Sequence, residues 1–246
     1  MNIKKIRIRD LYLHYADIQD FTDHMYELLK CGEKQSIIVH VNLRNYYFMN
    51  KDKELYDDIK KNSIPVFEGI GLKSCMALKG FGNLNDLNGT DLFPLFMKKL
   101  AGTDHKIYLL GGSKEALKGT IEHIEKKYTD IKIAGCHNGY FKIEDEERIV
   151  KDIDNSRADI LMISMGFPLQ EKFVFKNRNK FNVSLIWNLG GLFDIISGLK
   201  PRAPLFVRNL RLEWLHRFLK EPYRMLHRNT TAAAWSIGNI LFQKKQ

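Results

Sequence analysis

Residues 106–128 read KIYLLGGSKEALKGTIEHIEKKY: an apolar run, two glycines and a serine, and then a segment with helical spacing. This pattern predicts a strand, a tight turn at Gly111, Gly112 and Ser113, and an amphipathic helix. The same order recurs along the chain. Further strands are expected at 36–42, 64–67, 131–135, 159–164 and 183–187, and further helices at 45–62 and after Gly69. Such alternation, with near-continuously apolar strands, predicts an α/β fold with a mostly parallel sheet and helices on both faces.

The net charge of +10 is unevenly distributed along the 246 residues. From Lys200 onward ten basic residues are opposed by two acidic ones, a balance of +8, whereas the first 199 residues carry 29 basic and 27 acidic residues, a balance of +2. The charge shift coincides with SGLKPRAP (197–204), which contains a glycine and two prolines. We therefore expect a core at residues 1–199 and a basic appendage at 200–246. Such an appendage attracts either nucleic acid or anionic lipid.

Several classes of protein are not expected. No apolar run approaches the roughly 18–20 residues that span a bilayer, and the charged start MNIKKIRIRD leads into no apolar segment of a secretion signal. Three cysteines without CxxC spacing indicate a reduced, cytoplasmic setting with no cysteine-bound metal. HExxH, GxGxxG, Walker and GxSxG motifs are missing, so neither a zinc site, a nicotinamide cofactor, ATP nor a serine nucleophile is predicted.

Ligands of parallel sheets bind where strands end, so the strand-to-helix junctions are the candidate sites. Gly111, Gly112 and Ser113 could bind a diphosphate at the following helix, or simply form a turn with a helix cap. Glu68, directly after a strand, could act as a general base, or cap the next helix. His40 ends another strand, where a histidine with satisfied hydrogen bonds is the more common outcome.

Two later junctions are weaker candidates. MGFPLQEK (165–172) could present the amide of Gln170 to a sugar or a base, although a helix start with Pro168 in its first position explains the same residues. NLGGLFDIISG (188–198) supplies Asp194 after the last predicted strand, and its local pattern indicates only a turn.

Taken together, the junctions resemble the bacterial WecG/TagA/CpsF glycosyltransferases, known as glycosyltransferase family 26. The resemblance covers roughly residues 36–228 and rests on the order and separation of its motifs. These are Asn42, EGIG (68–71), NGTDLF (88–93), LLGGS (109–113), GCHNGYF (135–141), ADILMISMGFPLQE (158–171), NLGGLFDIISG (188–198), RAP (202–204) and LEWLHRFLKEPYR (212–224).

The resemblance implies a Rossmann-like fold and an inverting, metal-independent transfer of a sugar from a UDP-sugar to a polyprenyl-diphosphate-linked sugar. This chemistry builds surface polysaccharides, capsules or teichoic acid linkage units at the inner face of the cell membrane. The enzyme would need no cofactor and would be cytoplasmic and peripheral on that membrane. The donated sugar, N-acetylmannosamine, its uronic acid or glucose, is not specified by the sequence.

The resemblance also assigns roles to individual residues. Glu68 takes the place of the family's catalytic aspartate, and Asn42 matches its strand-end asparagine. Gln170 is expected near the sugar, and Arg217 and Arg224 at the UDP diphosphate, where bidentate arginines would neutralise the leaving group without a metal. The positions expected around the nucleotide are Gly112, Gly139, Tyr140 and Asp194.

The sequence departs from the family in three places. Glu68 replaces an aspartate, Asp86 stands where the family commonly has arginine, and His40 replaces a threonine two residues before Asn42. His40 could share proton handling with Glu68, because imidazole suits that role near neutral pH. The reversed charge at Asp86 leaves donor and acceptor open, and a degenerate, non-catalytic family member stays an alternative.

The appendage has three competing interpretations. RAPLFVRNLRLEWLHRFLKEPYRMLHR (202–228) would place apolar side chains nearly all round a helix studded with arginines. Without the resemblance, an ordinary core helix with solvated arginines would be the first interpretation of that composition. With the resemblance, it favours an anionic membrane surface, with Arg208 and Arg211 facing lipid, over a grip on nucleic acid, for which no known motif is present. A subunit interface in a homo-oligomer is the third interpretation.

Overall fold

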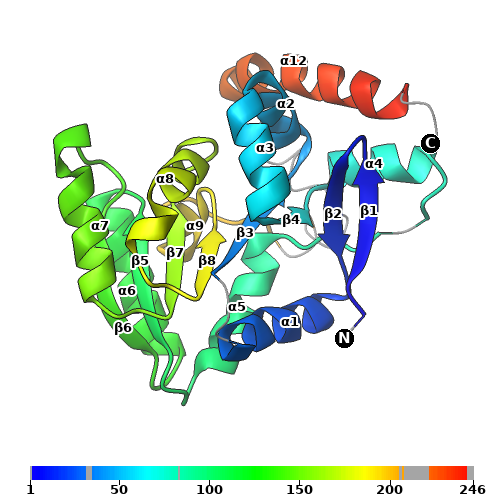
Figure 1. Ribbon diagram of the computed structural model, residues 1–246. Coiled ribbons are helices and arrows are strands. Elements are labelled where there is room, and N and C mark those ends of the chain that lie inside the picture. Colours follow the sequence, from blue (N-terminus) through cyan, green and yellow to red (C-terminus); the bar gives the residue numbers. More distant parts are fainter. Residues whose placement is uncertain (1, 32–34, 83, 205–206, 208–221, 243–246) are drawn as a thin grey trace.

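One eight-stranded sheet forms the centre of the protein (Figure 1). The computed structural model describes residues 2–31, 35–82, 84–204, 207 and 222–242, with the backbone alone for residues 31 and 222–229. The sheet order is β1-β2-β4-β3-β8-β7-β5-β6. The strands are β1 (Lys4–Ile8), β2 (Leu11–Tyr15), β3 (Ser36–Val41), β4 (Ile64–Phe67), β5 (Lys106–Gly111), β6 (Lys132–His137), β7 (Ile160–Ser164) and β8 (Leu185–Asn188). Only the β1–β2 pair is antiparallel, so the predicted mostly parallel sheet is confirmed.

Helices cover both faces of this sheet, as predicted. They are α1 (Ile18–Cys31), α2 (Leu43–Lys51), α3 (Lys53–Asn62), α4 (Ile70–Leu78), α5 (Gly89–Leu100), α6 (Lys114–Lys127), α7 (Glu146–Asn155), α8 (Leu169–Asn177), α9 (Leu192–Ile196) and α12 (Pro222–Leu241), with short 3₁₀ helices η1 (Ile143–Asp145) and η2 (Arg178–Lys180). One apolar core contains residues of α2, α3, α7 and α8, and the other contains residues of α1, α5, α6 and α9. In β3, Ile37 and Val39 face the first core and Ile38 faces the second. Burial on both faces explains why the strands are continuously apolar.

The structure corrects the expectation of one helix at 45–62. Two helices occupy this stretch, because Asp52 has an extended backbone (φ −125°, ψ 100°) and ends α2. Its carboxylate accepts a hydrogen bond of 3.1 Å from the Leu55 N–H and so caps α3. The β1–β2 hairpin was not predicted at all. Ile6 and Leu13 of this hairpin are buried, and Arg9 makes the turn with φ of 57°.

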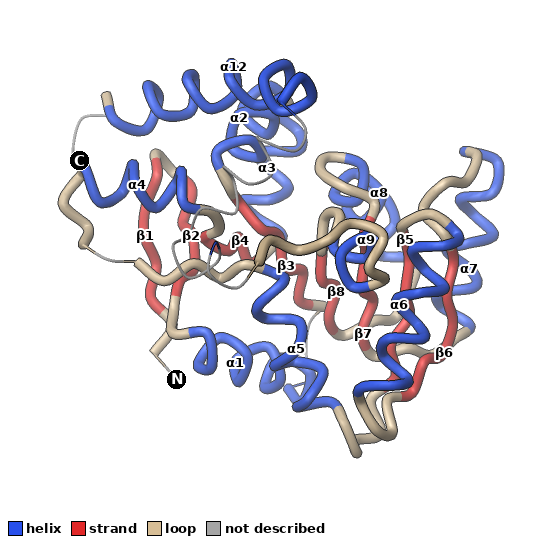
Figure 2. Tube along the Cα trace, turned by 180° about the vertical axis from the view of Figure 1, so that it is seen from behind, coloured by secondary structure: helices blue, strands red, loops and turns tan. Residues whose placement is uncertain are grey.

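The C-terminal helix α12 packs on the core beside α2 and α4 (Figures 1 and 2). Hydrogen bonds attach its described part: Ser236 Oγ donates to the Leu43 carbonyl (2.7 Å), Tyr46 Oη to Asn239 Oδ1 (3.1 Å), and Lys79 Nζ to the Ile240 carbonyl (3.0 Å). Among the described helices, α12 with its 20 residues included, none has the length and apolarity to cross a bilayer. The middle of the predicted appendage, 208–221, lies outside the described residues.

The chain changes direction in the sheet between β3 and β8. From β3 it continues to β4 on one side, whereas β8 is reached from β7 on the other. Loops diverge at such a switch point and leave a crevice at the carboxyl ends of the strands, where ligands of parallel sheets bind. The polar junctions identified in the sequence lie at this edge.

Candidate active site

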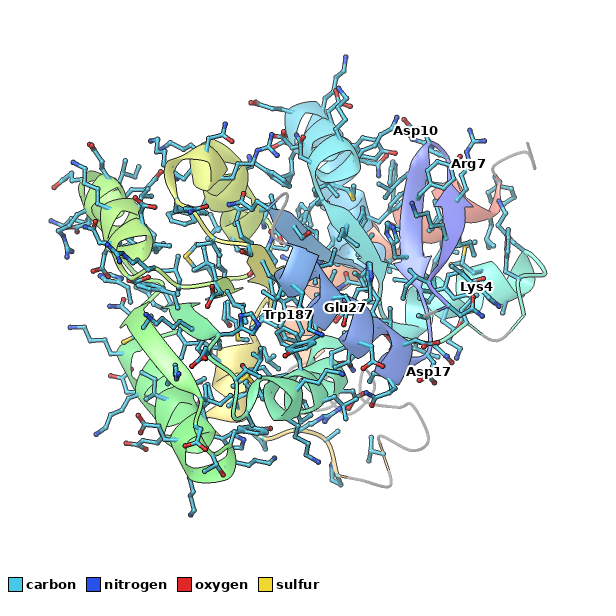
Figure 3. The ribbon with its side chains drawn as sticks, turned by 60° about the horizontal axis from the view of Figure 1, so that its bottom comes forward. Lys4, Arg7, Asp10, Asp17, Glu27 and Trp187 are labelled. Carbon is cyan, nitrogen blue, oxygen red and sulfur yellow. The ribbon has the colours of Figure 1, made fainter. Side chains whose placement is uncertain are left out.

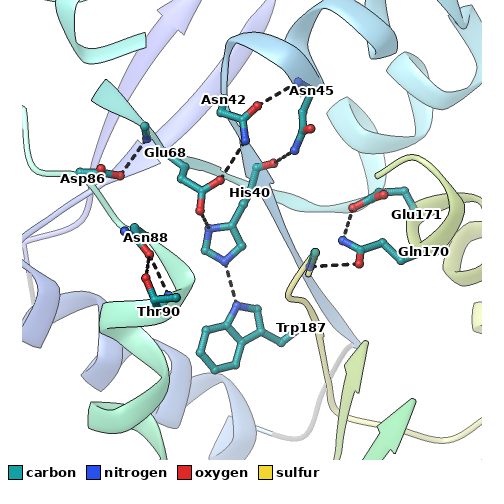
Figure 4. Close-up of polar contacts among 12 residues, drawn as sticks. His40, Asn42, Asn45, Glu68, Asp86, Asn88, Thr90, Gln170, Glu171 and Trp187 are labelled. Atoms are coloured by element: carbon teal, nitrogen blue, oxygen red, sulfur yellow. Dashed lines mark hydrogen bonds and ion pairs between the residues drawn. The ribbon is translucent and has the colours of Figure 1, made fainter. Parts of the chain in front are cut away.

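Three predicted residues meet at the carboxyl ends of β3 and β4 (Figure 4). Asn42 Nδ2 donates a hydrogen bond of 3.0 Å to Glu68 Oε2, and His40 Nδ1 lies 3.8 Å from Glu68 Oε1. The side chain of His40 is 8% exposed, whereas that of Glu68 is 24% exposed. The carboxylate is therefore held on its inner side by the Asn42 amide, with the His40 ring beside it but beyond hydrogen-bond distance, while part of it faces solvent.

The local sequence fixes this corner in place. Asn42 has an extended backbone and caps α2, its Oδ1 accepting from the Asn45 N–H at 3.0 Å. Asn45 in turn donates 2.9 Å to the His40 carbonyl, which ties the end of β3 to the first turn of α2. The Asn42 side chain thus caps α2 with its oxygen and orients the Glu68 carboxylate with its nitrogen.

Trp187 of β8 determines the protonation pattern of His40. Its indole N–H donates 2.9 Å to His40 Nε2, so Nε2 is an acceptor and the proton of the neutral ring sits on Nδ1, facing Glu68. Trp187 is fully buried in the middle of the molecule (Figure 3). Burial lowers the pKa of His40, and the nearby Glu68 carboxylate only partly opposes this. The ring is therefore neutral at neutral pH.

Replacing Trp187 with phenylalanine should raise the pKa of His40. The ring would lose the donor that occupies Nε2, and an imidazolium could then form without facing another N–H. Titration of the His40 Cε1–H signal by NMR, assigned with His40→Gln, measures the effect. An unchanged or lower pKa in Trp187→Phe would show that the indole does not control the ring.

Asp86 and Gly69 complete the turn that carries Glu68. Gly69 has φ of 93°, a conformation that favours glycine, and starts α4 without a side-chain cap of its own. Asp86 Oδ1 accepts a hydrogen bond of 2.8 Å from the N–H of Gly69, the residue just before the first turn of α4. Burial, and after it the Glu68 carboxylate, raise the pKa of Asp86 to about 6, and the hydrogen bond from Gly69 opposes both.

The NGTDLF and RAP motifs meet beside this cluster. Asn88 caps α5, accepting from the Thr90 N–H at 2.8 Å, and Arg202 forms an ion pair with Asp91 in the first turn of the same helix. A side chain at Gly89 would lie 3.8 Å from His40 Nε2. The start of α5 therefore lies against the His40 ring. The ion pair of Arg202 with Asp91 joins the RAP motif to the same helix start.

Gly112 and Gly139, both expected around the nucleotide, are brought together. The Gly139 N–H donates 2.9 Å to the Gly112 carbonyl, and a side chain at Gly139 would approach Gly111 Cα to 3.0 Å. A side chain at Gly111 would lie 2.3 Å from the Ser164 carbonyl oxygen, so only glycine fits where β5 passes β7. The double glycine thus permits close backbone packing at the carboxyl edge.

Ser113 and Tyr140 flank this turn. Ser113 caps α6: its Oγ accepts a hydrogen bond of 3.1 Å from the Ala116 N–H. The helix cap predicted as one of two roles for this turn is therefore present. Tyr140 is 82% exposed. An open hollow of about 330 Å³ runs between α6 and β6, lined by residues that include Lys114, His137 and Asn138. Asn138 of its lining directly precedes Gly139, so the hollow is a candidate place for part of a ligand.

Gln170 points into the protein interior. Its Oε1 accepts from the N–H groups of Met165 (3.3 Å), Gly166 (3.2 Å) and Gly190 (3.1 Å), and only 3% of the residue is exposed. Its Nε2 donates 2.8 Å to Glu171. In this arrangement Gln170 joins the loops after β7 and β8, and its amide is committed to the protein.

Glu171 is a buried acid with an incomplete set of partners. Within the described residues, its Oε2 and both amide atoms of Asn188 lack hydrogen bonds. Burial raises the pKa of Glu171 to about 7, against the opposing effects of the Gln170 and Asn188 amides and the Arg44 charge. This acid and Asn188 were not selected from the sequence, although a polar residue ending an apolar strand was a usable signal at Asn188.

Of the remaining predicted residues, one is described with its side chain. Asp194 of α9 forms an ion pair with Lys200. Arg217, Arg208 and Arg211 fall outside the described residues, and Arg224 lies in α12 with its side chain undescribed. In the part of the chain that the structure describes, no three His, Cys, Asp or Glu side chains converge as a metal-binding group.

Comparisons with known proteins agree with the resemblance. Residues 6–246 match the family described as Glycosyl transferase WecG/TagA/CpsF. An N-acetylglucosaminyldiphosphoundecaprenol N-acetyl-beta-D-mannosaminyltransferase from Bacillus subtilis is 31% identical over 213 residues, 85% of this chain and 81% of that protein. Proteins of the same name from Bacillus spizizenii (33% over 157 residues, 64% of this chain, 60% of theirs) and Staphylococcus aureus (34% over 124 residues, 50% and 48%) are also similar.

Proposed function

This chain belongs to the WecG/TagA/CpsF glycosyltransferase family, and from that premise we propose that it transfers an N-acetylmannosamine-type sugar or a hexose from a UDP-sugar to a polyprenyl-diphosphate-linked sugar. The names of the relatives specify N-acetylmannosamine as the sugar and N-acetylglucosaminyl-diphosphoundecaprenol as the acceptor. We propose the same reaction, with inversion and without a metal, in the assembly of teichoic acid linkage units or a related surface polysaccharide.

The observation that carries this proposal is the Glu68 cluster. A partly exposed carboxylate lies at the switch point of a parallel sheet, with Asn42 bound to one oxygen and His40 facing the other. A general base has to lie within hydrogen-bond reach of the hydroxyl that it deprotonates. Glu68 is the acid of this cluster that combines such exposure with an orienting hydrogen bond from Asn42 and a neighbouring imidazole.

In the proposed reaction the Glu68 carboxylate removes the proton from the acceptor hydroxyl. The hydroxyl oxygen attacks the anomeric carbon of the donor from the face opposite to UDP, and the bond between that carbon and the UDP oxygen breaks. The proton stays on Glu68, and UDP departs with the bonding electrons. Asn42 keeps the carboxylate oriented, and neutral His40, with Nδ1–H toward Glu68, steadies the negative charge before transfer.

We further propose that residues 1–199 form the catalytic core and 200–246 an appendage that brings it to an anionic membrane surface. The charge of +8 on 200–246 supports this, because each basic residue near an anionic leaflet contributes about 1 kcal/mol. Arg217 and Arg224 would contact the UDP diphosphate, while Gly112, Gly139, Tyr140 and Asp194 would surround the nucleotide. For Gln170 the inward hydrogen bonds support a role in holding the loops that contact the sugar.

The test is a panel of UDP-sugars with polyprenyl-diphosphate-GlcNAc, with and without EDTA, followed by chromatography of the product. Transfer of one or more sugars that EDTA leaves intact is the expected result. Loss of transfer in EDTA that a divalent ion restores would overturn metal independence. No product from any donor would support a degenerate family member, and retardation of random duplex DNA without liposome binding would support a nucleic-acid-binding protein.

Arg217→Ala and Arg208→Ala should separate the two proposed tasks of the appendage. Arg217→Ala is expected to lose turnover even with a short, soluble acceptor, because the departing diphosphate loses a charge partner. Arg208→Ala should lose activity chiefly with acceptor embedded in anionic vesicles. Equal loss by both variants with the soluble acceptor would contradict the division.

A further inference from the structure

The reversed charge at Asp86 has a defined place in the fold. Asp86 Oδ1 accepts from the N–H of Gly69, the residue directly after Glu68 (Figure 4). Since Gly69 adopts φ of 93° and its N–H is bound by Asp86, this hydrogen bond holds the turn from which the Glu68 side chain projects. The Asp86 carboxyl group is thus hydrogen-bonded to the peptide group that links Glu68, the proposed base, to Gly69.

We propose that Asp86 is a positioning residue for Glu68: it fixes the Glu68–Gly69 turn and, when ionised, adds the negative charge that draws the acceptor proton onto Glu68. This inference rests on the proposed function only in its second half. A proton moving toward Glu68 is attracted by an additional anion at the same corner, and the opposite charge, an arginine, would repel it.

The groups that face Asp86 come from each element packed around it. Glu68 follows β4 and Asp91 belongs to α5, and both raise the pKa of Asp86, whereas Lys73 of α4 lowers it. Asp91 is paired with Arg202, so it is the more neutralised of the two acids. Since the pKa of Asp86 is raised to about 6, mainly by burial, its charge changes within the pH range of a normal assay.

Asp86→Asn separates the two halves of the proposal. The asparagine oxygen can still accept from the Gly69 N–H, so the turn stays in place while the charge is lost. We expect kcat at pH 8 to fall about threefold to tenfold, because a half-transferred proton feels about half of a like-charge interaction. The KM for the donor should stay unchanged, and the step near pH 6 in the pH–rate profile should disappear. Asp86→Ala, which also loses the hydrogen bond from Gly69, should be slower still.

Asp52→Asn is the matched control. Asp52 likewise accepts a hydrogen bond from a backbone N–H at the start of a helix, here α3, but it lies outside the Glu68 cluster. This variant should keep the wild-type kcat and pH profile. If Asp86→Asn behaves as Asp52→Asn does, Asp86 is an ordinary acceptor for a backbone N–H and the proposal is overturned.

A carboxyl ¹³C NMR titration provides a readout that needs no turnover. The Asp86 signal, assigned with Asp86→Asn, should show an inflection near pH 6 in the wild type, and this inflection should move to lower pH in Glu68→Gln, which lacks the nearby charge. A shifted Asp86 titration in a protein without transferase activity would remove the proposed function but keep Asp86 as the partner of Glu68. Active protein with an unshifted Asp86 titration and an unaltered pH profile would defeat this inference alone.

Discussion

Replacing Glu68 with glutamine is expected to lower kcat about a hundredfold or more, the usual contribution of a general base. Glutamine keeps an oxygen for the 3.0 Å hydrogen bond from Asn42 and has nearly the same size. It cannot accept the acceptor proton, so loss of activity would report lost chemistry rather than lost shape. Initial rates of product formation with saturating donor and acceptor measure the effect.

Two controls define the outcome for Glu68→Gln. UDP binding, followed by calorimetry, should equal that of the wild type, because a residue that acts only in the transition state leaves ground-state binding intact. Glu125→Gln, an exposed change on α6, should leave kcat as it is. Wild-type kcat in Glu68→Gln would exclude Glu68 as the base.

The second large effect is expected at Glu171, through stability rather than turnover. Its pKa is raised from 4.5 to about 7 by burial, so the folded protein binds a proton that the unfolded chain releases. Stability from this group is therefore greatest below about pH 4.5, falls as the pH rises toward about 7, and stays low above it. The difference amounts to roughly 3 kcal/mol, because one pKa unit corresponds to about 1.4 kcal/mol.

Glu171→Gln should remove most of this dependence and stabilise the protein at pH 8. Glutamine keeps an oxygen for Gln170 Nε2, and its own N–H groups can donate to Asn188 Oδ1, which now lacks a donor. Urea denaturation at pH 5, 6, 7 and 8 gives the free energies of unfolding. Glu125→Gln should keep the wild-type slope. A steeper decline with pH in Glu171→Gln would mean that Glu171 is ionised and well paired in the fold.

The sheet was predictable because its strands are buried on both faces. A continuous apolar run such as IPVF predicts a buried strand by itself, and the observed β4 covers the predicted residues 64–67. The sequence did not predict the break between α2 and α3 at Asp52, because the charged stretch KDKELYDD (51–58) is compatible with one continuous helix. Only the fold shows that Asp52 both caps α3 and pairs with Lys172 of α8.

The candidate site was predictable in its members more than in their arrangement. Polar residues at strand ends identified His40, Asn42 and Glu68, and parallel strands necessarily bring such ends to one edge. The direction of a side chain is set by tertiary neighbours. The inward turn of Gln170 depends on Gly190, 20 residues away, and the tautomer of His40 depends on Trp187, 147 residues away. The sequence showed the reversed charge at Asp86, but its hydrogen bond to Gly69 joins residues 17 positions apart and could be seen only in the folded structure.

The attachment of α12 also has a consequence for how the protein is made. Ser236 binds the Leu43 carbonyl across 193 positions of sequence. At roughly 5–20 residues per second of synthesis, Leu43 waits about 10–40 s for this partner. A chain cut short by premature termination can contain every residue of the Glu68 cluster and still lack the helix that braces the start of α2 beside Asn42. The hydrogen bond that braces the start of α2 can therefore form only after Ser236 has been synthesised.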